Sequence, residues 1–126
     1  MFVWLDKSLV LSIHERQLAQ YGGNEGIRDE GVLTSVQAQS KKLAQGKSEI
    51  DLASLAANLV FGLVLNQPFV DGNKRTAHVA YRTLLALNGA NFNAGQKDMQ
   101  KTMLAIEDGK VDEDGFAAWL RKNITA

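Results

Sequence analysis

Residues that could bind an anion lie close together in one short segment, "LNQPFVDGNKRTA", residues 65–77. Gly72 allows a tight turn, and Asn73–Thr76 are predicted to form the first turn of a helix. The backbone N–H groups of such a turn have no intrahelical partners, and the helix dipole adds partial positive charge. Lys74 and Arg75 add full charges where cations disfavour the helix itself. We therefore predict that this turn binds a phosphate.

Three further side chains near this turn could complete a site for a phosphate and a metal ion. His78 and Arg82 lie three and seven residues after Arg75, near the same helix face, and could extend a basic track toward the ligand. Asp71 would offer a carboxylate to Mg²⁺, which completes its shell with phosphate oxygens and water. A Lys-Arg pair early in a helix is more often a solvated surface, and this alternative stays open on the residues alone.

The segment "GNKRT" also shares part of the P-loop pattern, G-x-x-x-x-G-K-[ST]. Gln67 stands where that pattern has its first glycine, and Asn73 separates Gly72 from Lys74. No strand is predicted before the segment, whereas a P-loop follows one. The sequence therefore excludes a P-loop.

The elements that must position this segment are predicted to be helices. Residues 52–65 are apolar on nearly all sides, which is typical of a buried central helix. Pro68 ends that helix, because the residue before a proline is forced out of helical conformation. The next helix is predicted to begin at about Asn73 and to end at Asn88-Gly89. Aspartates stand where four helices are expected to begin: Asp6, Asp29, Asp51 and Asp112.

The rest of the chain predicts further helices and one loop. A first helix should end at Tyr21–Gly23, a polar loop or flap should cover residues 41–50, and a late helix should lie near residues 97–107. Residues 2–5 could form a short strand, but one isolated run cannot make a sheet. His14 has polar neighbours and is expected to be exposed. We therefore predict an all-α fold, a compact bundle of about six helices in a single domain, residues 1–126.

Composition restricts the function classes. The formal net charge is zero, from 14 basic and 14 acidic residues, so a non-specific nucleic-acid binder is not expected. The absence of cysteine removes disulfide and thiolate chemistry. The N-terminus lacks the pattern of a signal peptide, and the apolar run at 52–65 is too short to span a bilayer. We expect a cytoplasmic protein that binds neither nucleic acid nor membrane.

The segment "QPFVDGNKRT", between a buried helix and a second helix, resembles the signature of the Fic/Doc family, HPFxxGN[GK]R. Asp71 fits the acidic position of that signature, and five residues match it as they stand: Pro68, Phe69, Gly72, Asn73 and Arg75. The segment "QYGGNEGIRDEGVLTSVQAQ" (20–39) is also similar to the corresponding part of Doc (death-on-curing) toxins. The resemblance therefore covers nearly the whole chain.

The resemblance implies a Fic-type helical fold and the transfer of part of a nucleotide to a hydroxyl of a target protein. Asp71 would correspond to the acid that binds Mg²⁺, and Phe69 to the buried anchor of the loop. The residues implied to hold the phosphates of ATP are Gly72, Asn73 and Arg75.

Lys74 distinguishes two activities within the resemblance. Typical Fic proteins have glycine at this position and transfer AMP. Doc-type members have lysine, transfer the γ-phosphoryl group of ATP to elongation factor Tu, and so block translation. A lysine fills the space that a glycine leaves for the phosphates and adds a cation. Lys74 therefore favours a kinase, with AMP transfer as the second interpretation and a catalytically inactive nucleotide- or partner-binding module as the third.

Gln67 departs from the family, which has its general-base histidine at this position. A glutamine amide cannot carry a proton near neutral pH, and loss of a general base costs ~10²–10⁴ in rate. His78 likewise stands where many members have a second arginine. Three explanations are open for Gln67: a deliberate substitution that allows a lethal enzyme to be expressed, a natural pseudoenzyme, or a lesser activity that persists through positioning and electrostatics.

Regulation is also implied. Self-inhibited Fic proteins carry an [ST]xxxE[GN] helix that occludes the nucleotide site, and this sequence has no such pattern. The resemblance therefore implies a separate, Phd-like antitoxin that folds a disordered segment onto the toxin.

Overall fold

Each helix predicted from an aspartate cap is present. In the computed structural model, which describes residues 2–46 and 50–125, every capping carboxylate accepts a hydrogen bond from the N–H three residues ahead, at 2.7–3.1 Å. The described elements are, in chain order, α1 (Lys7–Tyr21), α2 (Glu30–Gln45), α3 (Leu52–Asn66), α4 (Asn73–Leu87), β1 (Asn91–Phe92), α5 (Gln96–Glu107), α6 (Glu113–Asn123) and β2 (Ile124–Thr125). The predicted all-α bundle of about six helices is confirmed.

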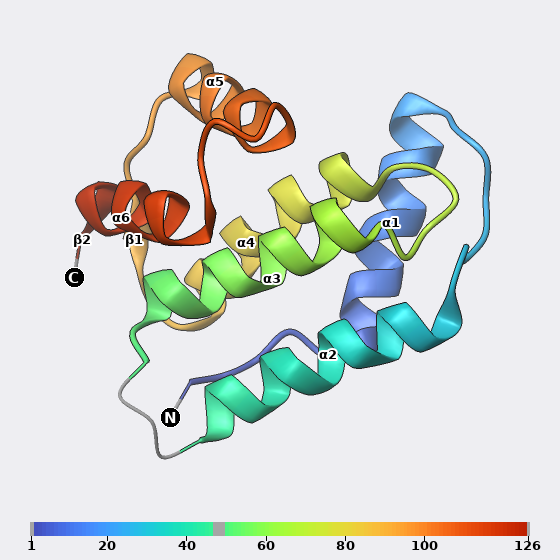
Figure 1. The fold of residues 1–126 in the computed structure, drawn as a ribbon, viewed down its shortest axis with the longest axis horizontal. Coiled ribbons are helices and arrows are strands. Elements are labelled where there is room, and N and C mark those ends of the chain that lie inside the picture. Colours follow the sequence, from blue (N-terminus) through green and yellow to red (C-terminus); the bar gives the residue numbers. More distant parts are fainter. Residues whose placement is uncertain (1, 47–49, 126) are drawn as a thin grey trace.

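The predicted central helix is α3. It lies between α2 and α4 (Figure 1) and also packs against α6. Nine of its fifteen residues are buried, on nearly all sides of the helix. None of the helices in the described ranges is long and apolar enough to cross a membrane. The all-round apolar pattern of 52–65 matches the burial of α3 among α2, α4 and α6.

The helix after the motif, α4, has one buried face, and Tyr81 lies at its centre. The Tyr81 ring meets the Phe92 and Phe116 rings edge-on, with centroids 5.7 and 5.4 Å away. Burial raises the pKa of the Tyr81 hydroxyl to about 12. These contacts fix α4 against α6 and β1, and α1 packs on α4 from another side.

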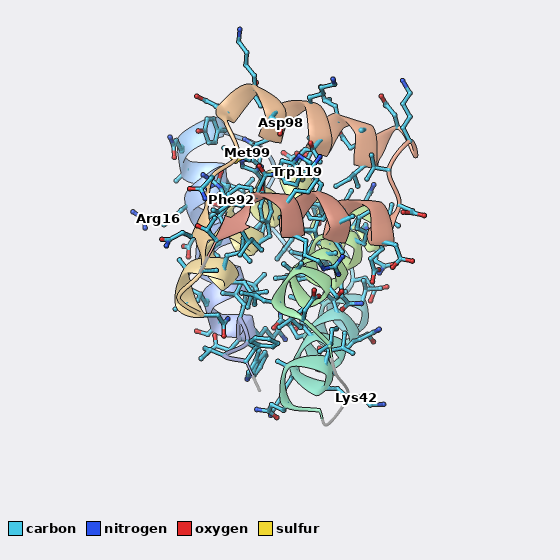
Figure 2. The ribbon with its side chains drawn as sticks, turned by 90° about the vertical axis from the view of Figure 1, so that its left-hand side faces the viewer. Arg16, Lys42, Phe92, Asp98, Met99 and Trp119 are labelled. Carbon is cyan, nitrogen blue, oxygen red and sulfur yellow. The ribbon has the colours of Figure 1, made fainter. Side chains whose placement is uncertain are left out.

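The last helices are joined by Trp119 and Asp98. The Trp119 Nε1–H donates to Asp98 Oδ2 at 3.0 Å, from α6 to α5 (Figure 2). The Trp119 ring also lies 5.5 Å from the Phe92 ring. This packing holds α5 over the core, where it forms one wall of a pocket described below.

The prediction of a loop at residues 41–50 is wrong for residues 41–45, which belong to α2. The helix α2 continues to Gln45, because Ala44 turns toward the core and the Lys41 ammonium lies 5.5 Å above the Trp4 ring. Residues 47–49, also within that prediction, lie outside the described part of the chain.

The chain ends also differ in detail from a simple helical pattern. Residues 2–5 are not a strand; the Phe2 N–H donates to the Ala44 carbonyl at 2.9 Å. The strands β1 and β2 pair antiparallel, with Asn91 opposite Thr125 and Phe92 opposite Ile124. Two-residue strands are too short to show alternation, so they could not be predicted from the sequence.

The start of α3 is tied to α6 by an ion pair. The Arg121 guanidinium donates to the Asp51 carboxylate and, at 3.0 Å, to Ser54 Oγ. The side-chain hydrogen bond from Arg121 holds the pKa of Asp51 well below its ordinary value of 3.8, although burial opposes this shift. The same carboxylate caps α3, so its ionisation affects two contacts.

We predict that this pair makes stability depend on pH in acid. The Asp51 carboxyl has an ordinary pKa in the unfolded chain and a lower one in the folded chain, so the unfolded state binds more protons between them. The stability contribution is present above about pH 4 and is lost as the pH falls toward the folded pKa. Urea unfolding midpoints near neutral pH and near pH 3 should therefore differ less in Arg121→Gln than in the native chain. Lys122→Gln removes a neighbouring charge as a control; equal acid dependence in all three proteins would contradict the prediction.

Candidate functional site

The candidate site begins with a strained residue at the end of α3. Gln67 has φ 47° and ψ 62°, and it is the only non-glycine residue with positive φ in the described ranges. Such a conformation costs energy and persists only where the surroundings enforce it. Here it reverses the chain so that Pro68 and Phe69 are buried while the Gln67 side chain stays exposed.

Arg28 enforces this reversal. Its Nε donates to the Gln67 carbonyl and its Nη2 to the Asn66 carbonyl, each at 2.6 Å. These are carbonyls at the C-terminus of α3, where a cation is favourable. Arg28 could not be identified from the sequence, because only the fold brings residue 28 beside residue 67.

The segment between α1 and α2 pairs with the motif loop. Ile27 and Phe69 form an antiparallel bridge. The Arg28 N–H donates to the Pro68 carbonyl at 2.7 Å, and the Val70 N–H donates to the Gly26 carbonyl at 3.1 Å. The two segments that carried the family resemblance are therefore neighbours in space.

The Asn73 side chain braces the loop from within. Its Oδ1 accepts from the Phe69 N–H and its Nδ2 donates to the Phe69 carbonyl, both at 2.9 Å. This amide is therefore occupied by the loop, and what Asn73 can offer a ligand is its backbone N–H. Gly72 has φ 78°, as its predicted turn requires.

His14 is buried, which contradicts the expectation that it is exposed. It is 6% exposed, and its ring stacks on Phe69 with centroids 3.7 Å apart and planes 9° apart. Its Nε2 lies 2.7 Å from the main-chain oxygen of Asp71, and because a carbonyl only accepts, Nε2 carries the proton. The polar neighbours in sequence were misleading; Val10, four residues earlier, shares the buried face of α1.

This contact orients the next peptide group. In a trans peptide the C=O and the following N–H point in opposite directions. Because His14 holds the Asp71 carbonyl, the Gly72 N–H points away from His14. The N–H groups of residues 72–75 have no hydrogen-bond partner among the described residues. They form the kind of donor set that the sequence predicted for a phosphate.

The cationic side chains around this turn are held loosely. The Lys74 ammonium lies 2.8 Å from Glu107 Oε2 in a pair that is exposed to solvent. Arg75 Nη2 donates to the Gly22 carbonyl at 2.9 Å, and its guanidinium lies 5.5 Å from the Tyr21 ring centroid. Exposed pairs of this kind contribute little stability, so both side chains can exchange these partners for an anion.

His78 and Arg82 form the second part of the predicted basic track. Arg82 Nε donates to the His78 carbonyl at 3.3 Å. Burial lowers the pKa of the His78 imidazole below its ordinary value of 6.5, and the positive charge of Arg82 lowers it further. His78 is therefore neutral near pH 7.

The predicted site residues line two adjoining pockets. The first, about 460 Å³, is lined by Gln67, Asp71 and the turn Gly72–Arg75, with Glu107 on its wall. The second, about 770 Å³, lies between α1, α4 and α5. Among the residues that the structure describes, its charged or titratable lining consists of Lys74, Arg75, His78, Arg82 and Tyr21, with no acid. Lys74 and Arg75 line both pockets. An extended polyanion could therefore occupy both at once.

Asp71 fits a metal ion that arrives with phosphate. Its Oδ2 accepts from the Asn24 N–H at 3.0 Å, and Oδ1 has no partner among the described residues. Those residues contain no group of three or more His, Cys, Asp or Glu side chains that could hold a metal by itself. A single carboxylate suits Mg²⁺, which takes its other ligands from phosphate and water.

Comparison with known proteins decides the family. A sequence model of the Fic/DOC family matches residues 4–85, which include α3, the motif loop and most of α4. The chain belongs to the Fic/Doc family. The Toxin Doc of Mycolicibacterium smegmatis (strain ATCC 700084 / mc(2)155) is 32% identical over 128 residues, covering 94% of this chain and 96% of that protein. The resemblance stated from the motif is confirmed.

We predict that His14 stabilises the loop chiefly through the hydrogen bond that its Nε2–H donates to the Asp71 carbonyl. His14→Phe keeps a ring against Phe69 but leaves the Asp71 carbonyl without its donor, which should cost about 1–3 kcal/mol of unfolding free energy. His14→Gln keeps a donor and should recover part of that loss. Urea unfolding measures both, with the exposed Arg16→Phe as a control. A His14→Phe variant as stable as the native chain would rule out this role.

Proposed function

We propose that this chain is a Doc-type toxin whose reaction is transfer of the γ-phosphoryl group of ATP to a hydroxyl of elongation factor Tu, which blocks translation in the cytoplasm. The observation that carries the proposal is the turn at residues 72–75. Its unpartnered N–H groups, Lys74, Arg75 and the Asp71 carboxylate all line one pocket. The similarity to a Toxin Doc over nearly the whole chain supports the same reading.

Each residue of the pocket would have a defined role in this reaction. The N–H groups at the start of α4 and the Arg75 guanidinium would bind phosphate oxygens. Lys74 would leave Glu107 and neutralise charge on the transferred group. Asp71 would hold Mg²⁺, which neutralises phosphate charge when bound. His78 and Arg82 would bind the rest of the nucleotide along the second pocket.

The chemical step defines what Gln67 lacks. The acceptor oxygen forms a bond to the γ-phosphorus, the bond from that phosphorus to the β–γ bridging oxygen breaks, and ADP leaves. The proton of the acceptor hydroxyl would pass to solvent water in this chain, because a glutamine amide cannot take it near neutral pH, and the missing base would slow the step. The backbone around Gln67 nevertheless suits the family's histidine, because histidine is among the residues that tolerate positive φ.

Two alternatives follow from the same site. An AMP-transferring enzyme would use the same pockets with the nucleotide reversed; Lys74, in place of the glycine of such enzymes, disfavours it. A catalytically inactive module would bind nucleotide or a Phd-like antitoxin at the same residues, and Gln67 favours it. Whether the protein is a kinase or an AMP-transferring enzyme, a Phd-like antitoxin would restrain it. The sequence of this chain has no inhibitory [ST]xxxE[GN] helix.

We predict that Gln67→His gains phosphoryl transfer. The variant should label elongation factor Tu from ATP radiolabelled at the γ-phosphate, faster than the native chain by ~10²–10⁴, and not from ATP labelled at the α-phosphate. Gln67→Asn, another amide without a basic nitrogen, is the matched control and should stay slow.

The other outcomes separate the alternatives. Label from the α-phosphate would replace the kinase with AMP transfer. If Gln67→His labels no protein in a cell lysate from either nucleotide, the enzyme reading fails and the binding module remains.

A further inference from the structure

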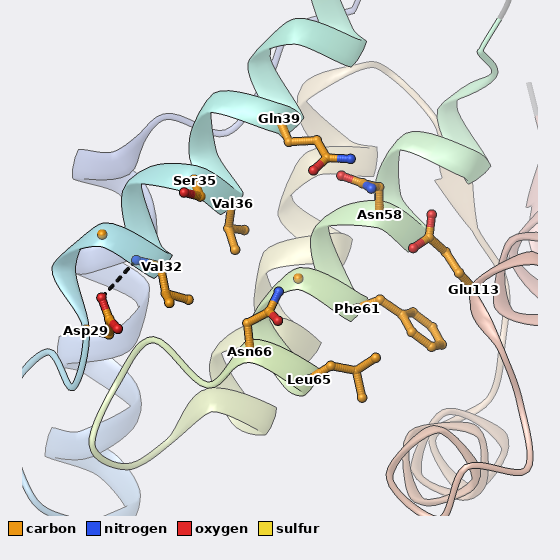
Figure 3. Close-up of a pocket in the computed structure, with 12 residues that line it drawn as sticks. Asp29, Val32, Ser35, Val36, Gln39, Asn58, Phe61, Leu65, Asn66 and Glu113 are labelled. Atoms are coloured by element: carbon orange, nitrogen blue, oxygen red, sulfur yellow. Dashed lines mark hydrogen bonds between the residues drawn. The ribbon is translucent and has the colours of Figure 1, made fainter.

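A groove of about 660 Å³ lies between α2 and α3, apart from the two pockets of the candidate site (Figure 3). Its floor is the close contact of Val36 with Gly62, where an added Cβ would lie 2.9 Å from Val36 Cγ1. A Cβ at position 62 would therefore force the Val36 side chain or its helix to shift. The groove is therefore a built feature of the helix pair.

This groove adjoins the candidate site. Leu65 lines both the groove and the pocket that contains Gln67, and Asn66 in the groove directly precedes Gln67. Around this junction large apolar side chains are exposed: Leu65 by 62% and Val70 by 49%. Leu65 therefore offers an exposed apolar contact to a ligand in either the groove or the pocket.

The walls of the groove carry polar side-chain groups that make no hydrogen bond to another described residue. Side-chain amides or hydroxyls from both helices line it, and none of them bonds to another described residue: Ser35, Gln39, Asn58 and Asn66. Figure 3 shows the Gln39 and Asn58 amides pointing toward one another from α2 and α3. Such groups match the N–H and C=O groups of an extended chain, which has no internal partners for them.

The charges of the groove have one sign. Asp29 and Glu113 line it, on opposite sides in Figure 3, and no Lys or Arg of the described part of the chain does. The Asp29 carboxylate caps α2 through the Val32 N–H, whereas Glu113 lies in the first turn of α6 without an ion-pair partner among the described residues. A ligand that extends toward Glu113 should therefore be cationic there.

We propose that this groove binds the acceptor protein, holding in extended form the segment that flanks the modified hydroxyl. An apolar side chain of that segment rests on Leu65, its main chain meets the amides of α2 and α3, and a Lys or Arg of the segment approaches Glu113. The assignment rests on the proposed function, because it supplies the acceptor for the same site. The hydroxyl then enters the neighbouring pocket at Gln67.

Cross-linking tests the docking without requiring catalysis. The chain has no cysteine, so Ser35→Cys and Thr34→Cys each give a single attachment point for a benzophenone maleimide. Both residues are exposed on α2, but only Ser35 lines the groove. With purified elongation factor Tu as the probe, irradiation should cross-link from residue 35 and not from residue 34. Equal cross-linking from both positions, or from neither, would overturn the proposal.

A charge reversal tests the same surface by kinetics. In the Gln67→His chain, Glu113→Lys should raise the KM for elongation factor Tu by about tenfold and leave the KM for ATP unchanged. Asp114→Lys is the matched control, because it changes the same charge in the same first turn of α6 but does not line the groove. Equal effects of the two substitutions, or none, would overturn the docking site.

The two proposals fail in different ways. If Gln67→His transfers no phosphate while residue 35 alone cross-links, the kinase hypothesis is contradicted and the docking surface is supported. If transfer is efficient but cross-linking is equal from residues 34 and 35 and KM changes equally at residues 113 and 114, the docking surface is contradicted and the kinase hypothesis is supported.

Discussion

The site depends on one backbone constraint, the chain reversal at Gln67 between the two central helices. It turns Phe69 into the core and leaves the first N–H groups of α4 open. Because a positive φ at glutamine is unfavourable, surrounding contacts must enforce it. Arg28 holds the carbonyls at the end of α3, Asn73 brackets the Phe69 peptide groups, and His14 stacks on the Phe69 ring. Contacts from three separate parts of the chain thus fix one short loop.

The positive charges in the first turn of α4 are unfavourable for the stability of the helix. A helix N-terminus favours anions, yet Lys74 and Arg75 lie in its first turn and no acid does. Their present partners, Glu107, the Gly22 carbonyl and the Tyr21 ring, are at the surface and can be exchanged for a ligand. A local arrangement that disfavours the fold without another structural gain is expected at functional sites. The neighbouring groove is acidic instead, so the two surfaces would select ligands of opposite charge.

The sequence predicted what depends on local chemistry. The Asp6, Asp29, Asp51 and Asp112 caps, the break at Pro68 and the turn at Gly72 all follow from residue type and spacing. All the proposed site residues line the two adjoining pockets. What failed depends on distant contacts: the burial of His14 follows from Phe69, 55 positions later in the sequence, and the continuation of α2 to Gln45 follows from packing on the N-terminal segment. Arg28 gave no local signal at all, because its partners are the backbone carbonyls of another helix.

We propose that the start of α4 is a preformed phosphate-binding turn. The most direct measurement is an NMR titration of the isotopically labelled chain with Mg²⁺ and ATP, with adenosine as the control ligand. ATP should shift the amide resonances of residues 72–75 and raise the pKa of His78, since an anion nearby favours its charged form, while adenosine should leave both unchanged. ATP-dependent shifts confined to other parts of the chain, with the amides of 72–75 unaffected, would contradict it.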